Sequence, residues 1–307
     1  MEQATQKPHV LIIGAAGRIG RAMAHIFSQA NVTDFDLCDS DTANCPVQRP
    51  LAESAPEADI IIMCVYSWVT REILEQIAPL VKKSAVIVSM AKGIEKDSNK
   101  TMDVVLDETI GDRASWCVMS GPMLAEEILA NGGSAGVIAS NSTRAFEILS
   151  AWMLPQDVIL SASSDVRGVA LSGVLKNVYV LTLGIADGLE WSANRRGWLL
   201  SRAAHEMHLV MEKLGGEQET TEGPAVLGDL VACAFSPLSR NRATGDTLVK
   251  TGELNPKSEG ANSLNSLLIL LGDAAKQFPL LQAIKAVALD HKSAHEIFDQ
   301  MISRHEV

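Results

Sequence analysis

The sequence has less positive than negative charge. Its 307 residues include 26 lysines and arginines against 37 aspartates and glutamates, a formal net charge of −11. A general binder of nucleic-acid backbones needs a basic surface, so we expect no nucleic-acid partner. A small anionic ligand remains compatible with this balance, because a local cluster of arginine and lysine can hold it.

Paired cysteines and metal-ligand motifs are also lacking. The five cysteines include no Cys-x-x-Cys motif; they are Cys38, Cys45, Cys64, Cys117 and Cys233. An odd, scattered set favours reduced thiols over a disulfide framework, so we predict a cytoplasmic protein. Histidine pairs occur at helical spacing at positions 205 and 208 and at 291 and 295, but no acid or cysteine pattern completes either set. We therefore predict no metal site.

Membrane and targeting signals are not expected. The early segment HVLIIGAAG is short and rich in glycine, and no basic stretch precedes it, so it does not predict a signal peptide. No apolar run is expected to reach the length of a membrane span, and we find no repeat or low-complexity tract. These features predict a protein without a membrane partner.

The first half of the chain alternates between strand and helix patterns. Short apolar runs predict strands at 9–14, 34–41, 58–66, 84–90, 115–120, 134–141 and 157–163. Apolar spacing near 3.6 predicts helices, among them 18–30, 68–82 and 143–153. Strands alternating with helices are typical of a doubly wound, mostly parallel sheet in an α/β fold.

The pattern of the second half of the chain predicts helices almost throughout. The predicted helices span 166–189, 193–214, 224–235, 264–278 and 294–304. The length is sufficient for two domains. We therefore predict a dinucleotide-binding domain over residues 1–163 and an all-helical substrate domain over residues 164–307.

A glycine-rich turn links the first predicted strand to the first predicted helix. The segment GAAGRIG contains Gly14, Gly17 and Gly20, and Asp39 follows nineteen residues after Gly20, at the end of the second strand. Glycine lets the chain turn tightly and approach a pyrophosphate at a helix N-terminus, and an acid at the end of the second strand can accept hydrogen bonds from a ribose. The combination predicts a dinucleotide cofactor.

One lysine lies inside the most apolar predicted helix. Lys176 in SGVLKNVYV is flanked on both sides by apolar or small residues. Such an ammonium either extends along the apolar surface toward water or is buried with a partner. In the second case burial lowers its pKa, which suits proton exchange near neutral pH.

Several segments resemble the NAD(P)-dependent glycerol-3-phosphate dehydrogenases. They are GVLKNVYVLTLGIADGL, GDLVACAFSPLSRNRATG, AKGIE and SGPMLAEE, and their order and spacing fit over essentially the whole chain. The resemblance implies a Rossmann domain followed by a helical substrate domain. It also implies reversible reduction of the ketone of dihydroxyacetone phosphate by a nicotinamide hydride.

The resemblance implies roles for three residues in the chemistry. Lys176 matches the lysine that donates a proton to the developing alkoxide, Lys92 a second lysine at the substrate, and Asp229 the acid that orients the catalytic lysine. A neighbouring ammonium at Lys92 would help to lower the pKa of Lys176.

The resemblance also assigns the binding residues. The implied substrate residues are Asn177, Gly121, Ser239, Arg240 and Asn241, of which the last three match a phosphate clamp. The implied cofactor residues are Gly14, Gly17, Arg18, Ile19, Gly20, Asp39, Ala125 and Glu259. Asp39 predicts a preference for NADH over NADPH, because its charge would repel the extra phosphate. The family further suggests a homodimer.

Two departures from the family pattern leave the substrate open. Met123 stands where many members carry a hydroxyl residue, and Cys233 or its neighbour Ala232 occupies the place of a usual threonine. An enzyme acting on another small ketone or 2-oxo acid is therefore an alternative. A protein that binds NADH without turnover is a second alternative, although it would need no proton donor.

Overall fold

The computed structural model describes residues 7–140 and 142–303, and the chain forms two compact units. The first, here the sheet unit, comprises the residues up to Ala91 together with Met102–Val166. The second, the helical unit, comprises Lys92–Thr101 and the residues from Arg167 onward. The predicted boundary lies between residues 163 and 164. In the structure the chain passes from the sheet unit to the helical unit between Val166 and Arg167, and the loop that carries Lys92 belongs to the helical unit.

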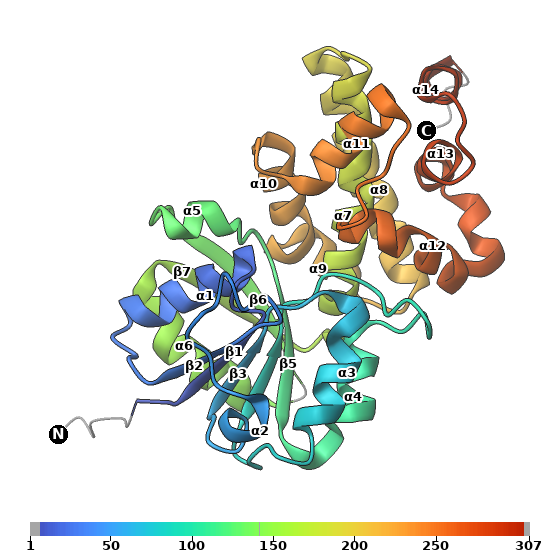
Figure 1. The fold of residues 1–307 in the computed structure, drawn as a ribbon. Helices are drawn as coiled ribbons and strands as arrows, with labels where there is room; N and C mark the ends of the chain where they lie inside the picture. The colour runs from blue at the N-terminus through green and yellow to red at the C-terminus, as the bar shows by residue number, and fades with distance from the viewer. Residues whose placement is uncertain (1–6, 141, 304–307) are drawn as a thin grey trace. The chain divides into compact units, whose positions relative to one another are not determined.

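A seven-stranded sheet forms the centre of the sheet unit, and the predicted α/β class is confirmed (Figure 1). The strands are β1 (Val10–Ile13), β2 (Phe35–Cys38), β3 (Ile60–Met63), β4 (Val86–Ser89), β5 (Ser115–Ser120), β6 (Ser134–Ala139) and β7 (Val158–Ser163). Their order is β2-β1-β3-β4-β5-β6-β7, and every neighbouring pair is parallel except β5 and β6. The carboxyl ends of β2, β1 and β3 therefore meet at one edge of the sheet.

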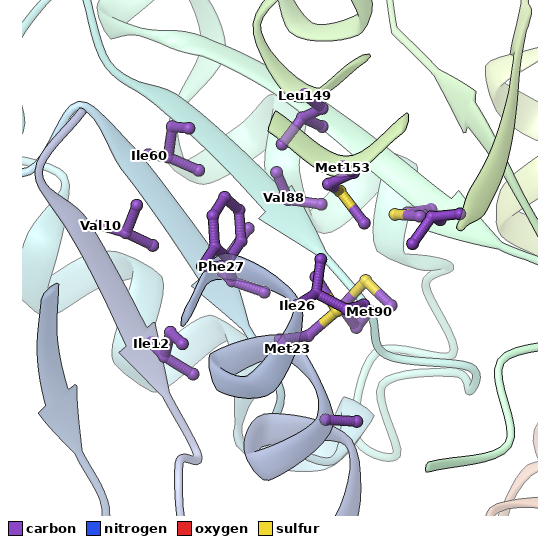
Figure 2. Packing of buried hydrophobic residues seen from close by; sticks show 14 of the residues in the cluster. Val10, Ile12, Met23, Ile26, Phe27, Ile60, Val88, Met90, Leu149 and Met153 are labelled. Carbon is purple, nitrogen blue, oxygen red and sulfur yellow. The ribbon is translucent and has the colours of Figure 1, made fainter. Parts of the chain in front are cut away.

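Helices cover both faces of this sheet, which explains why its central strands are continuously apolar. The helices of the unit are α1 (Arg18–Gln29), α2 (Leu51–Ser54), α3 (Ser67–Ile77), α4 (Met102–Thr109), α5 (Ala125–Leu129) and α6 (Thr143–Met153). Val10 and Ile12 pack with Phe27 of α1 and Leu149 of α6 on one face (Figure 2). Figure 1 shows α3 and α4 against the other face. This packing fixes the register of the strands and thus the position of the turn that follows β1.

The helical unit is built around α7 (Val166–Gly188). The other helices are α8 (Ala193–Lys213), α9 (Gln218–Glu222), α10 (Asp229–Phe235), α11 (Arg240–Thr251), α12 (Glu259–Leu271), α13 (Pro279–Ala288) and α14 (Ala294–Ser303). By length and composition α7 could cross a membrane, with a mean hydropathy of 1.6 over its most apolar window, so the expectation that no apolar run reaches span length is wrong. The whole of that window is buried inside the protein, as in a core helix.

Glycines let neighbouring segments approach α7 closely. A Cβ at Gly184 of α7 would lie 1.8 Å from the backbone oxygen of Arg242, and one at Gly245 of α11 would lie 2.1 Å from the backbone oxygen of Leu181. A Cβ at Gly173 would lie 2.7 Å from the side chain of Lys92. No larger residue fits at these crossings without backbone movement, so they hold α11 and the Lys92 loop against α7.

The sequence pattern missed several helices. The helices α2, α4, α5, α9, α11 and α13 were not predicted, and α12 begins at Glu259 instead of 264. The segment RNRATGDTLVKT of α11 is mostly polar, so it has no broad apolar stripe from which to read a helix. The predicted ends at Asn141 and Arg304 lie outside the described residues.

Candidate active site

The interior of α7 supplies a lysine that is paired with a buried acid. The ammonium nitrogen of Lys176 lies 3.2 Å from Oδ2 of Asp229, and that of Lys92 lies 2.7 Å from the same oxygen. Lys176 is 5% exposed and Asp229 is 2% exposed. Two ammonium groups therefore share one carboxylate oxygen, which leaves the cluster with an excess of positive charge. Of the two alternatives that the sequence left open, Lys176 is therefore buried with a partner and does not extend along the apolar surface to solvent.

Local structure explains why these three side chains meet. Asp229 is the first residue of α10 and follows a π-helical turn, Pro224–Gly228. Such turns are frequent at functional sites. Lys92 is brought to α7 by the close approach of its loop to Gly173. The family resemblance implied all three residues, although 137 positions separate Lys92 from Asp229.

The charges of the cluster shift the pKa of each member in a definite direction. Burial lowers the pKa of Lys176, but Asp229 and the sulfur of Cys233 outweigh burial, so the pKa of Lys176 lies above its usual value. Burial dominates at Lys92, where repulsion by Lys176 adds to it, so the pKa of Lys92 lies below its usual value despite Asp229. Burial raises the pKa of Asp229, but the two lysines outweigh it and hold that pKa low. The expectation of a lowered pKa at Lys176 is therefore wrong, and the lowered value belongs to Lys92.

Cys233 is a fourth member of this cluster. Its sulfur lies 3.4 Å from Nζ of Lys176 and 3.7 Å from Oδ1 of Asp229. Cys233 follows Asp229 by four residues on α10, so both side chains are on one face of the helix. Of the two positions that the sequence left open for the missing threonine, Cys233 is the one in contact with the lysine.

A buried glutamate in the same unit serves as a comparison, because its hydrogen bonds stabilise the fold. Glu206 of α8 accepts hydrogen bonds from the backbone nitrogens of Leu280 and Leu281, at 2.8 and 2.7 Å, and from the hydroxyl of Tyr179 at 2.8 Å. These donors satisfy the acceptor capacity of the carboxylate. Glu206 in turn supplies an acceptor for two backbone nitrogens in the first turn of α13, which have no partner within the helix. The Lys176 cluster differs because it gathers two cations on one anion.

Asn177 and Asn241 form a chain of hydrogen bonds beside the cluster. Nδ2 of Asn177 donates to the backbone oxygen of Lys92 at 3.0 Å, and Nδ2 of Asn241 donates to Oδ1 of Asn177 at 2.7 Å. Oδ1 of Asn241 accepts from the hydroxyl of Ser258 at 2.7 Å. Both predicted substrate residues thus already have protein partners, and they hold the loop of Lys92 in place.

The predicted phosphate clamp lies at the N-terminus of α11. The hydroxyl of Ser239 accepts a hydrogen bond from the backbone nitrogen of Arg242 and caps the helix. Arg242 binds Asp187 and the backbone oxygen of Ala234, so its guanidinium is occupied. Arg240 is exposed, and within the described residues it has no salt bridge or side-chain hydrogen bond. Of the predicted clamp, Arg240 therefore offers an available guanidinium at the positive end of a helix.

The glycine-rich turn after β1 is tight and closely packed. Gly14 has φ of +84°, and a Cβ there would lie 2.5 Å from the backbone oxygen of Cys64. A Cβ at Gly20 would lie 2.1 Å from the backbone oxygen of Gly14. Gly17 precedes α1 as its N-cap and has no side chain to bond the first turn. A turn of this kind before a helix N-terminus is where a pyrophosphate can bind.

Asp39 lies at the carboxyl end of β2 and is held by the same turn. Its Oδ2 accepts a hydrogen bond from the backbone nitrogen of Ala16 at 2.8 Å, and its Oδ1 accepts from that of Asp41 at 2.8 Å. Each carboxylate oxygen keeps further acceptor capacity for ribose hydroxyls. The glycine-rich turn and Asp39, which the sequence predicted to act together, are thus in direct contact in the structure.

The remaining predicted residues lie in different surroundings. Arg18 begins α1 and forms an ion pair with Glu126, next to Ala125 at the start of α5, while Ile19 packs against the core of the sheet unit. Gly121 follows β5 with φ of +145°. Glu259 is the first residue of α12, in the helical unit.

Met123 lies in the apolar core of the sheet unit, and His208 has a hydrogen-bond partner in the helical unit. Met123 is 7% exposed and belongs to the apolar core of the sheet unit, so the hydroxyl missing at this position is replaced by packing. Nδ1 of His208 lies 2.9 Å from the hydroxyl of Thr221. Among residues 7–140 and 142–303, no group of three or more His, Cys, Asp or Glu could hold a metal ion.

Comparison with known proteins places this chain in a family. Residues 42–146 match the model for the N-terminus of NAD-dependent glycerol-3-phosphate dehydrogenase, and residues 165–299 match that for its C-terminus. The chain belongs to the NAD-dependent glycerol-3-phosphate dehydrogenase family. The family resemblance read from the sequence is thereby confirmed.

Individual relatives agree with this assignment. The chain is 33% identical over 271 residues to glycerol-3-phosphate dehydrogenase [NAD(P)+] of Syntrophomonas wolfei, covering 84% of this chain and 78% of the relative. It is 30% identical over 264 residues to the enzyme of the same name from Fusobacterium nucleatum, covering 83% and 78%. The crystal structure of glycerol-3-phosphate dehydrogenase from Coxiella burnetii aligns with a TM-score of 0.85 at 25% identity, over 96% of this chain and 99% of that one.

Proposed function

We propose that this family member interconverts dihydroxyacetone phosphate and sn-glycerol 3-phosphate, with NADH as the preferred cofactor. The observation that supports this most is the buried cluster of Lys176, Lys92 and Asp229, in which two ammonium groups share one carboxylate oxygen. A protein that only sensed NADH would not need such a cluster, because it transfers no proton.

The cofactor would be held by the sheet unit. The turn of Gly14, Gly17 and Gly20 would bind its pyrophosphate, and Asp39 would accept hydrogen bonds from the adenosine ribose. When bound, reduced nicotinamide supplies a hydride to the ketone carbon of the substrate. A 2′-phosphate would meet the negative charge of Asp39, which is why NADH should be preferred over NADPH.

Proton transfer would be the task of Lys176. Hydride addition makes an alkoxide of the ketone oxygen, and the Lys176 ammonium donates its proton to that oxygen to leave an alcohol and a neutral amine. A pKa above the usual value keeps Lys176 charged before the reaction. Lys92 adds a second positive charge that stabilises the developing alkoxide, and Asp229 orients both ammonium groups.

The substrate phosphate would bind at the N-terminus of α11. Arg240 offers guanidinium donors there, whose forked geometry suits phosphate oxygens. The net charge of −11 makes a local cationic group necessary, because the overall field opposes a phosphorylated ligand. We further propose a cytoplasmic homodimer, on the grounds of the scattered cysteines and the family.

The test is the decrease of NADH absorbance with dihydroxyacetone phosphate, dihydroxyacetone or no ketone. We expect turnover with the phosphorylated ketone, at least about tenfold lower kcat/KM with NADPH, and very little turnover without the phosphate, since remote binding energy aligns the ketone. Oxidation of NADH only by an unphosphorylated ketone or a 2-oxo acid would mean a different substrate. NADH binding with no turnover on any of these ketones would favour the sensor.

A further inference from the structure

An aromatic pair follows β3 directly. The rings of Tyr66 and Trp68 are stacked, with centroids 4.4 Å apart and an interplanar angle of 7°. Both residues are partly exposed. The backbone oxygen of Tyr66 accepts hydrogen bonds from the backbone nitrogen of Val69 at 3.1 Å and from the hydroxyl of Thr70 at 3.0 Å. These bonds fix the pair at the start of α3, so the stack is a rigid surface.

The pair stands at the edge of the sheet where the cofactor turn lies. Strands β1 and β3 are parallel neighbours, with Ile13 opposite Met63 at their carboxyl ends. The turn after β1 touches the segment after β3, since a Cβ at Gly14 would lie 2.5 Å from the backbone oxygen of Cys64. The chain goes from β1 to β2 on one side and then to β3 on the other. The gap between β1 and β3 is thus the switch point at which ligands bind in such sheets.

The order of the strands gives the cofactor a direction. Asp39, at the end of β2, would hold the adenosine ribose, and the turn after β1 would hold the pyrophosphate. The other half of the dinucleotide must then leave the turn on the side opposite β2, which is the side of β3. We propose that the stacked pair of Tyr66 and Trp68 binds the nicotinamide half of the cofactor and so contributes to cofactor affinity. This inference rests on the proposed function.

The chemistry of the pair fits this role better than a packing role. Within the described part of the chain, neither the hydroxyl of Tyr66 nor the indole nitrogen of Trp68 has a hydrogen-bond partner, so both polar ends are available to the carboxamide of the nicotinamide. Aromatic side chains stack on planar rings with an energy that is readily measured. A pair that only filled the core would be buried, as Tyr179 is at 0% exposure.

Calorimetric titration with two ligands separates the halves of the cofactor. NADH carries the nicotinamide, and ADP-ribose is the same molecule without it. We expect Trp68→Leu and Tyr66→Leu to weaken NADH about tenfold, by loss of ring stacking, and to change ADP-ribose less than about twofold. Asp39→Ala should weaken both ligands alike. Trp198→Leu is the matched control, since Trp198 is a partly exposed ring paired with Trp191 in the helical unit, and it should change neither.

Fluorescence supplies a readout independent of affinity. Reduced nicotinamide absorbs where tryptophan emits, so bound NADH should quench Trp68, and the quenching at saturation should be smaller in Trp68→Phe than in the wild type. Equal weakening of NADH and ADP-ribose by the leucine variants, or no change for either, would overturn the inference. Unchanged quenching in Trp68→Phe would also overturn it. If the wild type binds no NADH, the proposed function fails together with this inference. If the wild type turns over NADH but the Trp68 variants bind NADH as tightly as the wild type, only this inference fails.

Discussion

The two units build their sites in different ways. In the sheet unit the proposed cofactor turn consists of backbone, and glycines such as Gly14 and Gly20 matter because a side chain would collide with a neighbouring carbonyl. In the helical unit the proposed catalytic site consists of charged side chains, and Lys176 and Asp229 matter because of their charge and burial. A substitution should therefore act through shape in the sheet unit and through charge in the helical unit.

This difference also separates affinity from catalysis. A turn made of backbone N–H groups can bind an anionic group but cannot exchange protons. A cluster with two ammonium groups on one carboxylate can donate a proton. Damage to the turn should raise the dissociation constant of NADH, and damage to the cluster should lower kcat.

The largest effect is expected at Asp229. Asp229→Asn removes the one carboxylate that both ammonium groups share, and breaking a buried ion pair in this way costs about 3–5 kcal/mol of unfolding free energy. Activity should be lost as well. Urea unfolding measures the first effect. Asp246→Asn is the control, because its partner Lys250 on α11 is largely exposed, and this substitution should change the free energy of unfolding much less.

The same variant predicts how the contribution of Asp229 to the free energy of unfolding depends on pH. Because the pKa of Asp229 is lower in the folded state, its stabilisation is present above the unfolded value of about 3.9 and disappears as the pH falls through the folded value. The difference in unfolding free energy between wild type and Asp229→Asn should stay constant from about pH 5 to pH 8 and shrink below about pH 4. A difference that grows in acid would show that Asp229 is not stabilised as an anion.

A somewhat smaller effect is expected at Arg240. Arg240→Ala removes the available guanidinium at the start of α11 and should lower kcat/KM for dihydroxyacetone phosphate by about 10- to 100-fold, the range of a charge-assisted hydrogen bond. Arg240→Lys should retain only part of the activity, since it loses the forked geometry. Arg195→Ala, another exposed arginine of the helical unit, is the control. Unchanged kinetics of Arg240→Ala would mean that the phosphate binds elsewhere.

The smallest effect is expected in the cofactor turn. A Cβ at Gly17 would lie 3.1 Å from the backbone oxygen of Gly14, which is tight but within reach of a small shift. Gly17→Ala should therefore fold and weaken NADH about tenfold by crowding the pyrophosphate, with kcat nearly unchanged at saturation. Gly197→Ala provides the control, because nothing lies within 4 Å of a Cβ there. Loss of kcat without loss of affinity in Gly17→Ala would contradict the separation of the two sites.

Local patterns in the sequence predicted the strands, the glycine turn and Asp39, because each depends on residues close together in the chain. The cluster of Lys176, Lys92 and Asp229 came from the family resemblance. No local pattern shows that Lys92 and Asp229 share a salt bridge.

The sequence could not give the features that depend on three-dimensional packing. The pKa shifts of Lys92 and Lys176 follow from the relative strength of burial and of Asp229, which no spacing reveals. The roles of Asn177 and Asn241 as partners of each other depend on the approach of two distant helices. The helix α11 was missed because its surface is polar, although Ser239 before it is a recognisable cap.

The most direct test of the account is the replacement of Lys176 by methionine, which keeps the volume and removes the proton donor. We predict that kcat for dihydroxyacetone phosphate falls about 100-fold or more while the dissociation constant of NADH stays within about twofold of the wild-type value. Lys250→Met, which changes an exposed lysine of the same unit, should leave both unchanged. Near-normal turnover by Lys176→Met would contradict the assignment of Lys176 as the proton donor.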